Sequence, residues 1–159
     1  MMAAVAQFSF VPVAETRELA SDLRDLFADL DSTLPLEQRV YSGECHPALD
    51  VIETQTGVEI IVDVAGVPPP AIRVLFRNDT LLVAGEKASG AVASEPTFHL
   101  VEREFGRFAR AVRLNGAFDV QRATASLAAG ELTIALPRLQ ERRGQAHMIP
   151  VNVPSDRRS

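Results

Sequence analysis

Tryptophan is absent from this chain of 159 residues, and cysteine and tyrosine each occur once. The single cysteine, Cys45, excludes an intramolecular disulfide framework and favours a reducing compartment. No run of 18 apolar residues occurs, so the sequence predicts no membrane-spanning helix. The N-terminus lacks a basic region followed by a continuous apolar one, so we expect no secretory signal. Together these absences predict a cytoplasmic protein.

Acidic residues outnumber basic ones, 21 to 16, and the formal net charge is -5. Nucleic-acid binding needs a clustered basic face, so we expect no nucleic-acid partner. Apolar residues make up 47% of the chain, which is enough for a substantial core. The length predicts one domain, or one domain with arms.

The sequence also lacks the motifs of catalysis and metal binding. It has no nucleophile elbow, no phosphate-binding loop and no paired cysteines. The adjacent Cys45 and His46 have no second pair at ligand spacing, and the remaining histidines, His99 and His147, share no such spacing either. We therefore predict no catalytic residue, no metal site and no cofactor, and the protein is not expected to be an enzyme.

From residue 48 onward the pattern of the chain is that of β-strands. Residues 125–137 show it best: apolar positions alternate with polar or small ones on both sides of Gly130, and Pro137 ends the second run. This alternation predicts a hairpin with a tight turn at Ala129 and Gly130. Candidate strands lie at 48–53, 57–64, 72–76, 80–85, 98–102, 107–114, 124–127 and 131–136. Many short strands separated by turn signals favour an all-β antiparallel sandwich.

Residues 15–30 instead show the 3.6-residue period of an amphipathic helix. The apolar stripe consists of Leu19, Leu23, Leu26, Phe27 and Leu30. Such a short helix needs a partner for its apolar face, either the sandwich or another chain. Its polar face is mixed in charge, which argues against a membrane partner. Residues 31–47 are expected to form a linker.

Several motifs of this sequence resemble the signatures of the small heat-shock proteins, the α-crystallin-domain family. Ala125, Gly130 and Leu132 have the spacing A-x-x-x-x-G-x-L of that family. Supporting stretches follow in the family's order: P-A-L-D-V-I-E-T from Pro47, V-D-V-A-G-V from Val62, L-L-V-A-G-E-K from Leu81, H-L-V-E-R-E-F-G-R-F-A-R from His99, and the tail motif Ile149, Pro150, Val151. The resemblance implies an immunoglobulin-like β-sandwich of the prokaryotic type. It divides the chain into an N-terminal arm with the amphipathic helix (1–46), an α-crystallin domain (47–137) and a C-terminal extension (138–159).

The resemblance implies an ATP-independent holdase chaperone, which binds partly unfolded proteins under stress and prevents their aggregation. Its expected partners are unfolded clients, further copies of itself and, downstream, ATP-dependent refolding chaperones. Client binding is expected at the N-terminal arm: Phe8, Phe10, Leu19, Leu23, Leu26, Phe27 and Leu30. A second surface is a groove between 72–76 and 124–127: Ile72, Val74, Phe76, Ala125 and Leu127. Two other readings stay open, a p23-like co-chaperone or adaptor and a stress protein that stabilises membrane surfaces.

Self-association is expected at two places. In the members that this sequence resembles, a long loop such as 85–97 carries a short strand to the first domain strand of a partner chain. That would make a dimer contact from Phe98, His99, Leu100, Val101, Glu102 and Arg110. Arg110 lies on the same strand face as Phe108 and Val112, so it needs a carboxylate partner if it is buried; the alternative is a solvated charged edge. The extended tail motif, Ile149, Pro150 and Val151, is expected to dock into the groove.

Overall fold

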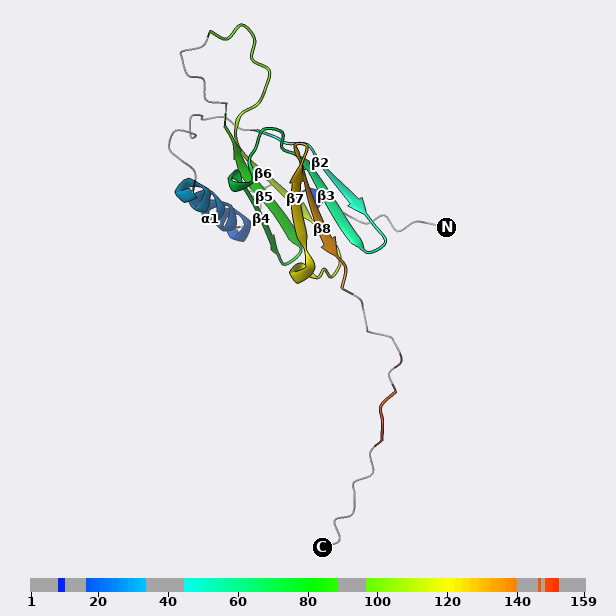
Figure 1. Ribbon diagram of the computed structural model, residues 1–159. Helices are drawn as coiled ribbons and strands as arrows, with labels where there is room; N and C mark the ends of the chain where they lie inside the picture. The colour runs from blue at the N-terminus through cyan, green and yellow to red at the C-terminus, as the bar shows by residue number, and fades with distance from the viewer. Residues whose placement is uncertain are drawn as a thin grey trace.

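Two antiparallel β-sheets pack face to face, and one helix lies against the outer face of the first sheet (Figure 1). The structure is a computed structural model, and it describes residues 9–10, 17–33, 45–88, 97–139, 146 and 148–151. The predicted all-β sandwich with one N-terminal helix is therefore confirmed.

The first sheet has the order β1-β6-β5-β4. It comprises β1 (Ser9–Phe10), β6 (Gly106–Arg113), β5 (Thr80–Lys87) and β4 (Ile72–Arg77). β4 is an edge strand and follows a short 3-10 helix, Pro69–Ala71. The backbone of Phe10 pairs with that of Val112, so part of the N-terminal arm completes this sheet.

The second sheet has the order β2-β3-β8-β7. It comprises β2 (Leu49–Glu53), β3 (Gly57–Asp63), β8 (Glu131–Pro137) and β7 (Thr124–Ala128), with a 3-10 helix at Val120–Arg122 before β7. Seven of the eight predicted strands therefore form, each within two residues of its expected bounds. The eighth, 98–102, is not a strand in the single chain.

The β7–β8 hairpin has the turn that the alternation predicts. Ala129 and Gly130 both have positive φ, 52° and 78°, which is the turn geometry that suits the right-handed twist of two paired strands. A Cβ on Gly130 would lie 3.2 Å from the Cβ of Ala65, so a side chain there would meet both strain and crowding.

The main core lies between the sheets and follows the period-2 alternation of the strands. β3 and β8 bury facing rows of aliphatic residues, of which Ile60 and Ile134 are cross-strand partners. The first sheet contributes Val83, Phe108 and Val112 from β5 and β6. Alternation thus places one face of each strand inside, as the sequence predicted.

Helix α1 (Arg17–Thr33) begins two residues later and ends three residues later than expected. In its last turn the hydroxyl of Ser32 donates to the carbonyl of Asp29 at 2.7 Å, and that of Thr33 donates to the carbonyls of Asp29 and Leu30. The expected linker from residue 31 was therefore wrong for residues 31–33. The apolar stripe of α1 packs on the sandwich of its own chain, which decides between the two alternatives left open for it.

Candidate functional site

Residues 97–105 form an irregular arm that precedes β6 and carries large apolar side chains to solvent. Phe98, Leu100 and Val101 are all exposed, Leu100 to 76%. The predicted acceptor of this arm, β2, lies at the edge of its sheet, and its Ile52 is also exposed. A strand at 98–102 needs a neighbouring strand to pair with, and no described residue of this chain pairs with it. The exchange of this strand between two chains therefore stays a prediction.

The root of the arm is held against the sandwich. Two cations lie over the ring of Phe105, with the Arg103 guanidinium 5.0 Å and the Lys87 ammonium 5.8 Å from its centroid. The backbone N–H of His46 donates to the Glu104 carboxylate at 3.1 Å. These contacts fix where the arm leaves the domain, beside the segment that leads into β2.

Arg110 lies half-buried on β6 and reaches the same segment. Its Nη1 donates to the carbonyl oxygen of Pro47 at 2.6 Å, two residues before β2 begins. Phe108 and Val112, on the same strand face, belong to the main core. The carboxylate partner expected for Arg110 at a dimer contact stays a prediction.

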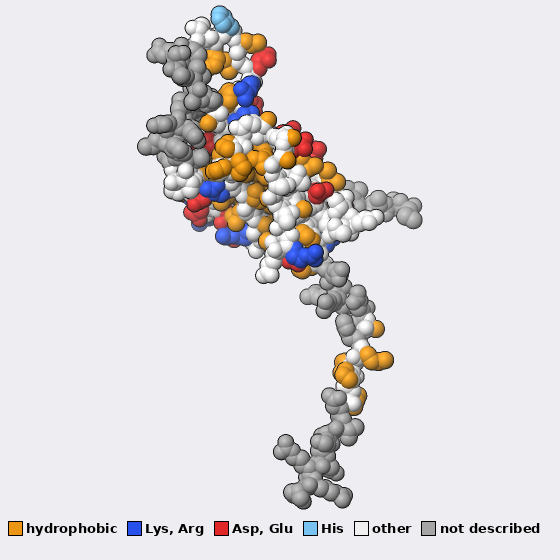
Figure 2. Space-filling model, in the orientation of Figure 1, with side chains coloured by type: hydrophobic (Ala, Val, Ile, Leu, Met, Phe, Trp, Pro, Cys, Tyr) orange, Lys and Arg blue, Asp and Glu red, His pale blue; other side chains and the backbone are white. Residues whose placement is uncertain are grey.

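The residues of the predicted groove lie on β4 and β7, which are edge strands of the two sheets. The groove itself stays a prediction. Ile72 is buried, and Phe76 and Leu127 pack partly buried against the core, whereas Val74 and Ala125 are exposed. Phe76 is braced edge-on by Phe118, with 6.2 Å between ring centroids. Hydrophobic side chains gather on the face between α1 and β7, over the start of β4 (Figure 2).

The tail motif is fully open to solvent in the single chain. Ile149 is 83% and Val151 is 91% exposed, and Met148 before them is also exposed. Docking of this motif into the groove stays a prediction.

The expected client-binding residues of the N-terminal arm have packing roles in this conformation. Leu19 and Leu30 are buried, and Leu23, Leu26 and Phe27 are partly buried. Phe8 lies outside the described residues. Packing on the sandwich is one of the two alternatives stated for the helix stripe: Leu30 and Phe27 join the main core, and the other three leucines contact the outer face of the first sheet. Client binding at these residues stays a prediction.

Sequence reasoning missed a set of ion pairs that flank α1. Arg73 Nε lies 2.6 Å from the Asp29 carboxylate, and Arg77 Nη2 lies 3.1 Å from that of Asp22. A weak signal was available, since alternation along β4 places Arg73, Leu75 and Arg77 on the face opposite Ile72 and Phe76. Their partners are 40 or more positions away, which no local pattern specifies.

The electrostatics of the site offer little for chemistry. Burial raises the pKa of the Cys45 thiol, with a smaller lowering by Lys87 and a further rise from Glu104. Among the described residues, no three His, Cys, Asp or Glu side chains gather into a possible metal site. No helix in the described part of the chain is long and apolar enough to cross a bilayer.

Comparison with known proteins decides the family. The model of the Hsp20/alpha crystallin family matches residues 50–152. The chain belongs to this family. Its members are non-enzymatic chaperones, in agreement with the prediction that the chain is not an enzyme.

Relatives of this Hsp20 chain come from fungi, plants and bacteria. It is 29% identical to heat shock protein 16 of Schizosaccharomyces pombe over 121 residues, which cover 75% of this chain and 85% of that one. It is 33% identical to spore protein SP21 of Stigmatella aurantiaca over 95 residues, covering 60% of this chain and 56% of that one.

Solved structures carry the same fold. Heat shock protein 16.0 of Schizosaccharomyces pombe has a TM-score of 0.58 and 25% identity, covering 67% of this chain and 99% of that one. A small heat-shock protein from Xylella fastidiosa, described as having a distinct high-order structure, has a TM-score of 0.54 and 26% identity over 69% of this chain and 94% of that one.

Proposed function

We propose that this protein is an ATP-independent holdase, which binds partly unfolded proteins in the cytoplasm and prevents their aggregation. The observation that carries the proposal is the set of large apolar side chains left in solvent on a stable sandwich. They lie at the arm, on β2, on β4 and in the tail: Phe98, Leu100, Val101, Ile52, Val74, Ile149 and Val151. Membership of a chaperone family supports it. The mechanism needs no nucleotide, and bound clients would pass to ATP-dependent refolding chaperones.

The building block is a dimer made by strand exchange. The exposed arm, whose root is fixed by Phe105, would pair through 98–102 with β2 of a partner chain, and each chain would thereby cover the other's bare edge. Replacing 88–104 by a tight turn between β5 and β6 should give a monomer on light scattering. An unchanged dimer would contradict the exchange.

Arg110 supports the dimer because it holds the segment before β2. With its guanidinium on the Pro47 carbonyl, it sets the position of the strand that accepts the partner's arm. The change Arg110→Ala should speed subunit exchange between labelled dimers, whereas Arg122→Ala, an exposed arginine before β7, should leave it unaltered. Equal exchange rates in both variants would show that Arg110 has no role at the contact.

The tail motif joins dimers into larger assemblies by docking between β4 and β7 of a neighbouring dimer. Burial of one Ile and one Val contributes at most about 3–6 kcal/mol, and ordering the tail backbone opposes it by roughly the same amount, so a single tail binds weakly and several act together. The double change Ile149→Ala with Val151→Ala should reduce any assembly to dimers in a dilution series.

The experiment that tests the function is the suppression of turbidity of a heat-denatured client without ATP. Full suppression at a few chains per client supports a holdase. Dependence on one defined folded partner would favour the p23-like adaptor instead, and co-sedimentation with vesicles would favour a membrane-stabilising role. If the folded protein does not reduce the turbidity of the client at all, the proposal is wrong.

A further inference from the structure

Helix α1 covers an apolar patch on the outer face of the first sheet that is separate from the main core. The patch, here called the seam, is formed by Leu19, Leu23 and Leu26 of the helix and by Leu75, Leu82 and Ala111 of the sheet. Three of these six, Leu19, Leu82 and Ala111, are buried. The helix thus rests on a small apolar surface that would be open to solvent without it.

Guanidinium groups border this surface on the sheet side, and carboxylates on the helix meet them. Arg77 contacts both Glu18 at 3.3 Å and Asp22 at 3.1 Å. Arg107 contacts Asp31 and stacks over the Phe27 ring at 4.7 Å. We call Arg73, Arg77 and Arg107 the arginine rim.

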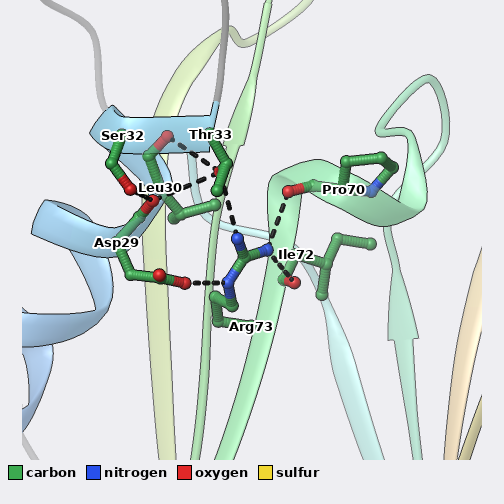
Figure 3. Close-up of polar contacts among 7 residues, drawn as sticks. All are labelled: Asp29, Leu30, Ser32, Thr33, Pro70, Ile72 and Arg73. Atoms are coloured by element: carbon green, nitrogen blue, oxygen red, sulfur yellow. Dashed lines mark hydrogen bonds and ion pairs between the residues drawn. The ribbon is translucent and has the colours of Figure 1, made fainter.

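Arg73 is the best-defined member of the rim, as Figure 3 shows. Its Nε binds the Asp29 carboxylate at 2.6 Å, while its Nη2 donates to the Thr33 hydroxyl at 3.1 Å. Its Nη1 donates to the carbonyls of Pro70, at 2.7 Å, and Ile72. Backbone carbonyls of the 3-10 helix and of the start of β4 therefore hold Nη1, while side chains of α1 hold Nε and Nη2.

The two ends of the helix are held by different kinds of contact. Asp22 is almost fully buried by the contact, but Arg73, Arg77, Arg107 and the other carboxylates keep a quarter to a half or more of their side-chain surface in water. Exposed ion pairs are weak and are screened by salt. At the other end of α1, Leu30 reaches into the main core, so the carboxyl end is held better than the amino end.

We propose that the outer face of β4, β5 and β6 is a docking surface for acidic amphipathic segments, and that α1 occupies it as a displaceable cover. The argument is charge complementarity: an apolar strip edged by three arginines fits a helix whose apolar stripe is flanked by Asp and Glu, as α1 itself shows. Displacement of α1 exposes two apolar surfaces: the sheet side of the seam and the apolar stripe of the helix. That clients of the holdase are such segments rests on the proposed function; the docking surface itself does not.

The test uses the full chain and a fluorescent, end-capped peptide with the sequence of residues 17–33. In the cover-weakened variant, Asp22→Asn, Asp29→Asn and Asp31→Asn remove three of the four helix carboxylates that contact the rim. Glu18 and the arginine rim are left intact. We expect the peptide to bind this variant at least tenfold more tightly than wild type, with an affinity that falls as salt is raised. The matched control, Glu59→Gln, Asp63→Asn and Glu131→Gln on the other sheet, changes charge equally and should behave as wild type.

Two further experiments test the chemistry of the surface. Adding Arg73→Gln and Arg77→Gln to the cover-weakened variant should abolish the gain in affinity. A peptide with Gln or Asn in place of Glu18, Asp22, Asp29 and Asp31 should bind the cover-weakened variant at least tenfold more weakly than the acidic one. Circular dichroism checks that each variant folds, and the single change Asp29→Asn should give a smaller effect of the same sign.

Equal binding to wild type and to the cover-weakened variant would overturn the proposal, as would binding that is indifferent to the arginines or to the peptide's charge. The outcome is separable from the holdase test. If the chain binds the acidic peptide but does not suppress turbidity, the docking surface stands and the proposed function is wrong. If it suppresses turbidity but does not bind the peptide, the proposed function stands and the docking surface is wrong.

Discussion

The main core and the seam are both apolar, but they are built differently. The core lies between two hydrogen-bonded sheets, and residues such as Ile60 and Leu81 are fully enclosed there by both sheets. The seam has three buried residues and a border of half-exposed ion pairs. From this difference we expect the seam to open at a lower free energy than the core.

The largest effect is expected from a truncation in the core. Ile60→Ala removes a fully buried side chain between the sheets and should lower the free energy of unfolding by about 3–4 kcal/mol. Chemical denaturation monitored by circular dichroism measures it. A loss below about 1 kcal/mol would show that the core is less well packed than its burial indicates.

A truncation in the seam should act locally. Leu19→Ala removes a buried contact near the amino end of α1 and should lower the protection of the helix amides by about 1–2 kcal/mol. Hydrogen exchange of the strand amides should change by less than about 0.5 kcal/mol. Equal loss of protection in the helix and the strands would mean that the helix and the sandwich unfold as one unit.

The ion pairs should contribute less and should respond to salt. Arg77→Gln removes the contacts with Glu18 and Asp22 and should cost about 1 kcal/mol of helix protection at low salt, with a smaller cost at 1 M NaCl. Arg138→Gln is the matched control, because Arg138 forms a 2.6 Å ion pair with Glu53, and neither residue contacts the rim. An identical effect of both variants on the helix amides would contradict a specific role for the rim.

The smallest effect concerns Cys45. Its buried thiol has a raised pKa, so the folded chain holds this proton more tightly than the unfolded chain does. The free energy of unfolding should therefore fall as pH rises above the ordinary thiol value of 9.0. Denaturation at pH 7 and pH 10 of wild type and Cys45→Ala checks it; an equal decline in both would assign the change to other groups.

Local patterns predicted the fold well, because alternation and helical periodicity follow from which face of each element is buried. The hairpin at Gly130 and the paired strands β3 and β8 are examples. What the patterns could not give is which surfaces meet. The stripe of α1 is equally suited to its own sheet or to another chain, and the Arg107–Asp31 pair joins residues 76 positions apart.

The arm shows the opposite limit. Residues 98–102 have the composition of a strand, but a strand exists only where a neighbour supplies hydrogen bonds. In the part of the chain that the structure describes, no strand pairs with them. Local patterns single out apolar residues such as Val74 and Ile149, which the structure leaves exposed, and their roles stay predictions. The candidate site could not be predicted where it depends on tertiary contacts, as at the arginine rim.

The central claim is that α1 is a cover separable from the frame, and native-state hydrogen exchange in low denaturant tests it most directly. The account predicts that amides of 17–33, above all near Leu19, exchange through an opening at least ~2 kcal/mol lower in free energy than that of β3 and β8, with a smaller denaturant slope. The same opening free energy and slope for helix and strands would contradict it.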